Sequence, residues 1–243
     1  DLDPEGIAVS ASGDGSFWVA SEGAGTVGDP ARPVTSNSVV VHADASGSII
    51  ETIALPAEVN ALQVRFGFEG VASVMEGGNE ILYVAFQRAW AGDPLPNNST
   101  DGGKVRIGRY DTTTGNWTFA YYPLDVRESP NGGWVGLSEI TSLGDGEFAV
   151  VERDNQANTD ARIKRVYSFS VDGVAFQPQG VPGDRDVNGF RIHARHLRPD
   201  DVALPVVVDV HRRVHPDGAL RRTEQGTIGG KQTVHFSMHS FQW

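Results

Sequence analysis

Three segments of the chain repeat one pattern, and this repeat constrains the fold more than any other feature. In each copy a glutamate precedes a short apolar run, and the glutamates are Glu5, Glu69 and Glu139. Their spacing along the chain is nearly constant. Self-similarity at a near-constant spacing indicates an array of one supersecondary unit, in which neighbouring copies bury each other's apolar faces.

Each copy also contains two predicted β-hairpins. The first hairpin of each copy turns at Asp14-Gly15, Gly78-Asn79 or Asp145-Gly146. These residue types tolerate positive φ, which tight hairpin turns require. Apolar and polar residues alternate in the second hairpins, which cover residues 38–47, 105–115 and 165–173. Four strands per copy predict an all-β fold, a β-propeller of four-stranded blades with about three readable blades.

The repeat covers residues 1–183 and stops before the last part of the chain. Residues 184–243 lack a further Glu-Gly start and are predicted to form a divergent tail or an irregular further blade. Two histidine pairs there, His193/His196 and His211/His215, have a helix-like metal-binding spacing, but the surrounding sequence does not predict a helix. Known propellers have about 4 to 8 blades. The ring is therefore completed by the tail, closed by oligomerisation, or incomplete because the chain is a fragment.

Composition excludes several classes of function. The chain has no cysteine, so disulfides, zinc–thiolate sites and cysteine nucleophiles are absent. Its net charge of −11 argues against nucleic acid and anionic membrane surfaces as partners. No apolar run approaches the length of about 18 residues that a membrane helix needs. The chain starts at Asp1 without a signal peptide, as a mature chain or a fragment would.

The repeated glutamates form a candidate metal site. Equivalent points of successive blades lie on an arc around the axis of a propeller, so Glu5, Glu69 and Glu139 are expected to approach one another. Glu22, at the end of the second strand of the first copy, is a further candidate ligand. A cation would relieve the repulsion among these carboxylates, and oxygen ligands favour Ca²⁺ or another hard divalent cation. The alternative is a structural role, in which the glutamates accept backbone N–H hydrogen bonds.

A second candidate site follows the second strand of the third copy, where Glu152, Arg153 and Asp154 are consecutive. Arginine suits bidentate binding of a phosphate, and an aspartate suits a metal or general-base role. These three residues are the predicted catalytic group. The alternative is a surface ion pair beside a turn.

Several motifs together resemble those of the phytase-like family that is described as having esterase-like activity. They are Asp3-Pro4-Glu5-Gly6-Ile7-Ala8, Trp18-Val19-Ala20-Ser21-Glu22, Gly67-Phe68-Glu69-Gly70, Leu137-Ser138-Glu139-Ile140 and Val151-Glu152-Arg153-Asp154. The resemblance covers about residues 1–180. It implies a bacterial, exported propeller, extracellular or periplasmic, that hydrolyses small phosphate or carboxylic esters. Family members usually have at least one more blade before these motifs and a further Glu-Gly blade after them, so the chain is expected to be truncated.

Two other functions remain open from the sequence. One is a propeller that binds a protein or glycan and catalyses nothing, which the lack of a complete catalytic constellation favours. The other is a lactonase-like propeller with one central Ca²⁺, which would share the acidic ring and differ in substrate. A tightly bound cation would separate the two hydrolases from the binding module.

Overall fold

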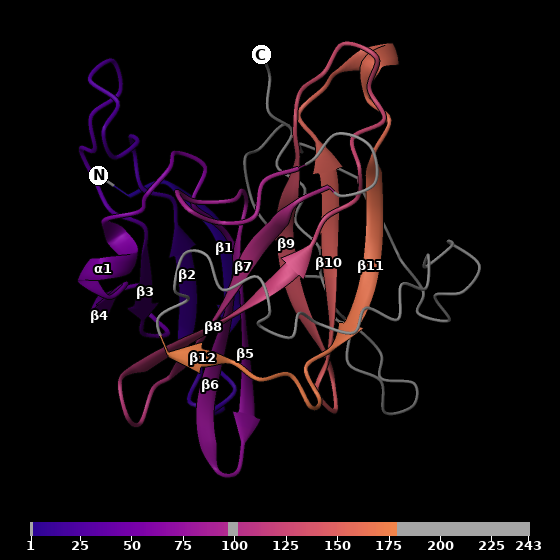
Figure 1. The fold of residues 1–243 in the computed structure, drawn as a ribbon. Helices are drawn as coiled ribbons and strands as arrows, with labels where there is room; N and C mark the ends of the chain where they lie inside the picture. The colour runs from indigo at the N-terminus through magenta and orange to yellow at the C-terminus, as the bar shows by residue number, and fades with distance from the viewer. Residues whose placement is uncertain (1, 97–101, 179–243) are drawn as a thin grey trace, which may run out of the picture. The chain divides into compact units, whose positions relative to one another are not determined.

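The apolar runs of the repeat form three antiparallel sheets in the computed structural model (Figure 1). The structure describes residues 2–96 and 102–178. The first sheet has the order β1-β2-β3-β4, with bounds Pro4–Val9, Phe17–Ser21, Val39–Ala43 and Ile49–Ala54. The predicted tail, residues 184–243 with both histidine pairs, lies outside the described residues.

The second and third sheets follow in chain order. The second has the order β12-β8-β7-β6-β5, and its strands β5 to β8 span Phe68–Glu76, Asn79–Phe86, Lys104–Asp111 and Asn116–Pro123. The third has the order β11-β10-β9, with bounds Lys164–Ser170, Glu147–Asp154 and Val135–Gly144. The helical elements of the described residues are α1 (Ala57–Asn60) and a 3-10 turn at Asn158–Asp160. This confirms the all-β class.

One hairpin turn forms where it was predicted, at Asp145-Gly146, and another lies one residue earlier than predicted, at Gly77-Gly78 and not at Gly78-Asn79. Gly77 and Gly78 have φ values of 57° and 92°, and Asp145 and Gly146 have 49° and 74°. Two successive residues with positive φ match the right-handed twist of the flanking strands. The turns therefore fix the register of the β5–β6 and β9–β10 hairpins.

The third copy differs from the predicted four strands. Among the described residues its sheet has three strands, and the short strand β12 (Gln177–Pro178) pairs with β8 of the second sheet. The segment leading to β12 packs Val171, Val174 and Phe176 against the core between these two sheets. Because these side chains pack on that core, the segment runs from the third sheet to the edge strand β8 of the second.

Two apolar cores separate the three sheets. One includes Trp18, Phe68 and Phe86, and the other includes Tyr83, Phe148 and Phe169. Strand β6 contributes to both cores, because its alternate residues face opposite sides of the sheet. The second sheet is therefore buried on both faces, which explains the unbroken apolar run Ile81-Leu82-Tyr83-Val84-Ala85-Phe86.

The first strands of the three sheets, β1, β5 and β9, lie side by side (Figure 1). Glycines allow this close approach. A Cβ atom on Gly6 would lie 2.6 Å from the Cα atom of Gly70, and one on Gly70 would lie 2.6 Å from the backbone nitrogen of Ile140. The Glu-Gly pairs of the repeat thus combine a carboxylate with a contact between sheets.

Within the described ranges, no helix has both the length and the apolar character needed to cross a membrane.

Candidate functional site

The site is built on β-bulges in the three first strands. Pairing with the second strand places Pro4 opposite Ser21 and Gly6 opposite Ala20, so Glu5 is the extra residue of a bulge in β1. Glu69 is the extra residue of the corresponding bulge in β5, and Ser138 that of β9. A bulge bends its strand and redirects a side chain, and bulges are common beside active sites.

Each bulged residue has a partner just beyond or at the end of the second strand. Gln87 Nε2 donates a hydrogen bond to Glu69 Oε1, and Arg153 Nε donates one to Ser138 Oγ. In the first sheet the corresponding residues are two carboxylates, Glu5 and Glu22, with ligand oxygens within 4.8 Å of each other. The three pairs are therefore amide–acid, arginine–hydroxyl and acid–acid.

This register shifts the third copy by one residue from the alignment made on the sequence. Ser138, and not Glu139, occupies the position of Glu5 and Glu69. Glu139 lies beside β5, where its Oε1 would be 2.7 Å from a Cβ on Gly70. Burial raises the pKa of Glu139 to about 7, against the hydrogen bond from the backbone N–H of Ile140.

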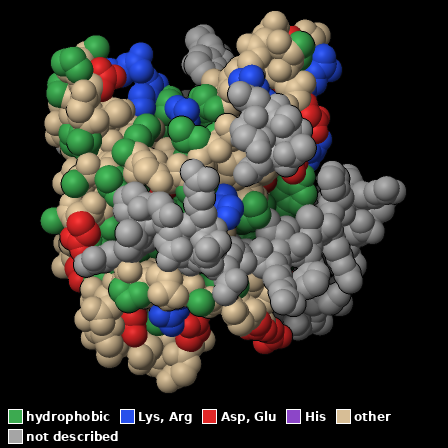
Figure 2. Space-filling model, in the orientation of Figure 1, with side chains coloured by type: hydrophobic (Ala, Val, Ile, Leu, Met, Phe, Trp, Pro, Cys, Tyr) green, Lys and Arg blue, Asp and Glu red, His purple; other side chains and the backbone are tan. Residues whose placement is uncertain are grey.

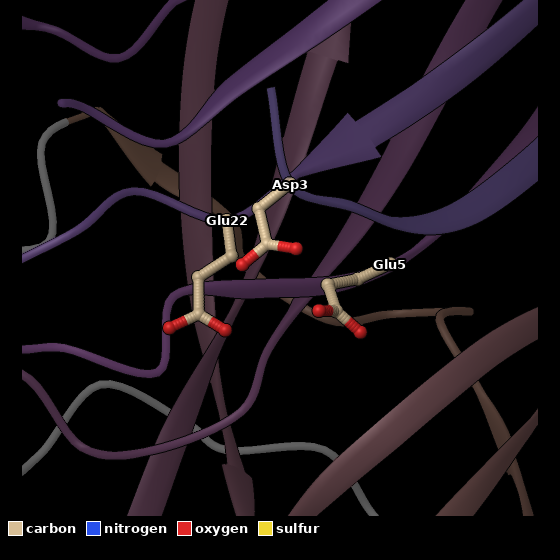
Figure 3. A group of neighbouring side chains, drawn as sticks. All are labelled: Asp3, Glu5 and Glu22. Atoms are coloured by element: carbon tan, nitrogen blue, oxygen red, sulfur yellow. The ribbon is translucent and has the colours of Figure 1, made fainter. Parts of the chain in front are cut away.

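A third carboxylate joins the acid–acid pair. Asp3, Glu5 and Glu22 each offer one oxygen within 4.8 Å of the others, and Figure 3 shows all three side chains projecting to the same side. Backbone pairing holds them there, because Glu22 N donates to Asp3 O at 2.9 Å and Asp3 N donates to Ser21 Oγ at 3.0 Å. We call Asp3, Glu5 and Glu22 the acidic cluster. The sequence analysis missed Asp3, because it lies just before β1 and meets Glu22 only through the pairing of the strand ends.

Electrostatics couple the acidic cluster to Glu69. Burial raises the pKa of Glu5 to about 7, and the charges of Asp3 and Glu22 add to this rise. Burial also raises the pKa of Glu69 to about 9, with a further contribution from the charge of Glu5. The pKa of Glu22 rises through burial, while the backbone N–H of Phe66 opposes the rise. The raised pKa favours the protonated form of Glu69 at neutral pH.

Arg153 lies close enough to Glu5 and Glu69 for its charge to act on both. Its positive charge opposes the rise in pKa of both Glu5 and Glu69. Its guanidinium carbon lies 5.7 Å from the centre of the Trp134 ring. Of the predicted catalytic group, Arg153 is the member that the structure brings to the predicted metal ligands.

Strand alternation sends Glu152 and Asp154 to the other side of β10. Glu152 is 1% exposed and accepts hydrogen bonds from the backbone nitrogen of Asp125 at 2.5 Å and from Tyr122 Oη at 3.4 Å. Asp154 is also buried, and its Oδ2 accepts from the backbone nitrogens of Arg162 and Ile163 at 2.6 Å and 2.9 Å. Glu152 therefore holds the backbone of Asp125 in place, and Asp154 holds the backbone of Arg162 and Ile163.

The buried Glu152 predicts a pH dependence of stability. Burial raises the pKa of Glu152 to about 8 from 4.5, with the charge of Asp125 adding to the rise. The folded state therefore binds the proton more tightly than the unfolded state. The stabilisation that protonated Glu152 gives the folded state is fully present below pH 4.5, and it is lost as the pH rises through 8. We expect Glu152→Gln to remove this loss, so that at pH 9 the variant melts about 5 °C or more above the wild type.

Thermal melts from pH 5 to 9, followed by circular dichroism, measure this difference. Glu147→Gln is the matched control, because Glu147 lies on the same strand and is exposed. Its melting curve should follow the wild type at every pH. Parallel curves for Glu152→Gln and the wild type would contradict an ionisable, buried Glu152.

The fold and the site together define an all-β protein with a carboxylate cluster and an arginine where three sheets meet. The family model for phytase-like proteins, described as the esterase-like activity of phytase, matches residues 1–196. The chain therefore belongs to the phytase-like family, as the sequence motifs predicted. No curated protein matches the chain significantly.

Proposed function

We propose that the protein is a hydrolase of phosphate or carboxylic esters that uses a divalent cation, with Ca²⁺ the first candidate. The observation that carries this proposal is the acidic cluster next to Arg153 in a member of the phytase-like family. Its substrate would be a small ester or phosphoester.

The acidic cluster suits a hard cation. Three carboxylates within 4.8 Å of one another repel, and a divalent cation removes that repulsion. Ca²⁺ takes 6 to 8 oxygen ligands, so three side chains leave positions for water or a substrate oxygen. Asp3 is exposed and Glu5 and Glu22 are half-buried, which keeps the site open to solvent.

Glu69 and Arg153 supply the remaining chemistry in this proposal. A cation on the acidic cluster would draw the pKa of Glu69 down from about 9 toward neutrality, where a general acid is most effective. Water would then attack the phosphorus or acyl carbon and release its proton to solvent, and Glu69 would protonate the alkoxide that leaves. Arg153 would stabilise negative charge on the oxygens of the ester as the bond breaks. The bound cation would polarise the same ester as a Lewis acid.

We further propose that the three sheets are blades of a propeller. The face-to-face packing of the sheets and the contact among β1, β5 and β9 support this arrangement. The outer face of the first sheet supports it too, because Ile7 and Val9 are 62% and 74% exposed there. A sheet with apolar residues on both faces is expected to have a neighbour on each side. That neighbour would be another blade of this protein or of a second copy.

The test combines calorimetric titration of the metal-stripped protein with Ca²⁺ and hydrolysis of p-nitrophenyl phosphate and p-nitrophenyl acetate. We expect Ca²⁺ binding and turnover of at least one ester that depends on Ca²⁺. Glu5→Gln should weaken Ca²⁺ binding about tenfold or more, because it removes a charged ligand.

The matched control is Glu51→Gln, which makes the same change at an exposed position of β4. It should leave Ca²⁺ binding and turnover unchanged. Failure of the folded wild type to bind Ca²⁺ would overturn the cation site. Binding without turnover of either ester would contradict the hydrolase and favour a binding module.

A further inference from the structure

Three arginines surround two half-buried aromatic rings beside the acidic cluster. The guanidinium carbon of Arg65 lies 4.0 Å from the centre of the Phe66 ring. That of Arg88 lies 4.7 Å from the centre of the Trp134 ring and 5.6 Å from that of Phe66. Arg153 contacts Trp134 from the third sheet at 5.7 Å. The two rings are 5.3 Å apart, so they form one platform that all three cations share.

A strained loop places this platform. Phe66 has a φ of 71°, a left-handed conformation that costs a side-chain-bearing residue about 1–2 kcal/mol. Glu22 stabilises that conformation, because its Oε1 accepts a hydrogen bond from the Phe66 nitrogen at 2.7 Å. Such strain is concentrated at functional sites. A member of the acidic cluster therefore also sets the position of the aromatic platform.

The three arginines differ from the other buried or half-buried arginines of the described residues, which are paired with carboxylates. In the described parts of the chain, Arg65, Arg88 and Arg153 form no salt bridge. Elsewhere the protein pairs buried or half-buried arginines with carboxylates, as in Arg106–Asp93 at 2.7 Å, Arg109–Glu76 at 2.6 Å and Arg165–Glu128 at 2.6 Å. The charges of Arg65 and Arg153 act on Glu22, Glu5 and Glu69, but among the residues that the structure describes no carboxylate holds these guanidinium groups directly. Their N–H groups can therefore donate to an anion that arrives from solution.

The Arg65–Phe66 end of the platform borders a cavity that a ligand can enter. A cavity of about 310 Å³ is lined by Phe66, Arg65, Arg32 and Glu22, among others. Figure 2 shows Lys and Arg side chains next to hydrophobic ones in the upper part of the view. The cavity thus adds one further cationic side chain, Arg32, beside Glu22 of the acidic cluster.

We propose that Arg65, Arg88 and Arg153, on the Phe66–Trp134 platform, form a binding site for a phosphate group. Three positive charges match a phosphate dianion better than a carboxylate, and each planar guanidinium can donate two parallel hydrogen bonds to phosphate oxygens. The aromatic rings hold the guanidinium planes by cation–π contact and exclude water from one side of them. This inference rests on the proposed function, since it makes the substrate a phosphoester and not a neutral carboxylic ester.

Burial agrees with this assignment. It lowers the pKa of Arg88, and the nearby charge of Arg65 lowers it further. Both effects raise the free energy of the unliganded site. A bound phosphate would neutralise the crowded charges and remove that penalty.

The test is calorimetric titration of the full chain with inorganic phosphate in a buffer containing EDTA, so that no cation can hold the anion. The wild type should bind phosphate, and acetate more weakly. Arg88→Gln should weaken phosphate binding about tenfold or more, because charge-assisted hydrogen bonds are lost. Arg65→Gln tests the same site from the other ring if Arg88→Gln does not fold. Melting curves establish that each variant is folded.

Arg162→Gln is the matched control, because Arg162 is exposed and lies outside the platform. It should bind phosphate as the wild type does. A folded wild type without phosphate binding, equal binding of phosphate and acetate, or undiminished binding by folded Arg88→Gln and Arg65→Gln would each overturn the site. These outcomes are independent of turnover. Phosphate binding without ester hydrolysis would refute the hydrolase alone, and hydrolysis of a neutral ester without phosphate binding would refute this site alone.

Discussion

Gly70→Ala should destabilise the protein by roughly 3 kcal/mol or more, because the added methyl group has no room. Its Cβ would lie 2.6 Å from the backbone nitrogen of Ile140 and 2.7 Å from Glu139 Oε1. The backbone of β9 cannot move away without separating the second and third sheets. Chemical denaturation of the folded variant measures the loss, and a lower midpoint at an unchanged denaturant slope is the expected result.

Gly77→Ala is the control for this substitution. Gly77 has a φ of 57°, and a Cβ there would meet nothing within 4 Å. It should cost only about 1–2 kcal/mol, from the left-handed backbone. Equal losses for the two variants would show that crowding between β5 and β9 is not what Gly70 prevents.

Asp93→Ala should cost about 3–5 kcal/mol, because it leaves the fully buried Arg106 without its counter-ion. Asp93 Oδ1 accepts hydrogen bonds from Arg106 Nη2 at 2.7 Å and from Tyr121 Oη at 2.8 Å. Its Oδ2 accepts one from the Trp90 nitrogen at 2.8 Å. The variant therefore leaves the buried charge of Arg106 without its carboxylate, and it leaves the hydrogen-bond donors of Tyr121 and Trp90 without their acceptor. Its free energy of unfolding, from denaturant titration, gives the cost.

Two comparisons test that explanation. Glu128→Ala removes one carboxylate from the exposed pair with Arg165 and should cost less than about 1 kcal/mol. The double variant Asp93→Leu/Arg106→Met should be more stable than Asp93→Ala, because no buried charge remains. A double variant that is less stable than Asp93→Ala would mean that Arg106 stabilises the fold by contacts other than its ion pair.

The fold class and the hairpins were predictable because their signals are local. A pair such as Asp145-Gly146 tolerates the positive φ that a tight turn requires, and alternation of apolar residues marks the buried face of a strand. The strand pairing at the end of the third copy was not predictable from local signals. Its sheet has three strands among the described residues, because Gln177–Pro178 pair with the edge of β8 in the second sheet.

The candidate site was predicted in part. Glu5, Glu69 and Glu22 were found from the repeat, and Arg153 from its neighbours in sequence. Asp3 and Ser138 were missed because each is ordinary in sequence and becomes significant only through strand pairing. Phe66 and Arg88 were missed for the same reason, since segments far apart in the chain bring them together.

By itself the sequence determined the repeat, the all-β class, the family and the presence of a recurring carboxylate, since each of these is a matter of residue type at a fixed spacing. Tertiary structure alone decided which side chains meet. A one-residue difference in the position of the bulge replaces Glu139 by Ser138 and turns Arg153 toward the acids. The physical reason is the two-residue period of a strand, because a shift of one residue moves every side chain to the opposite face.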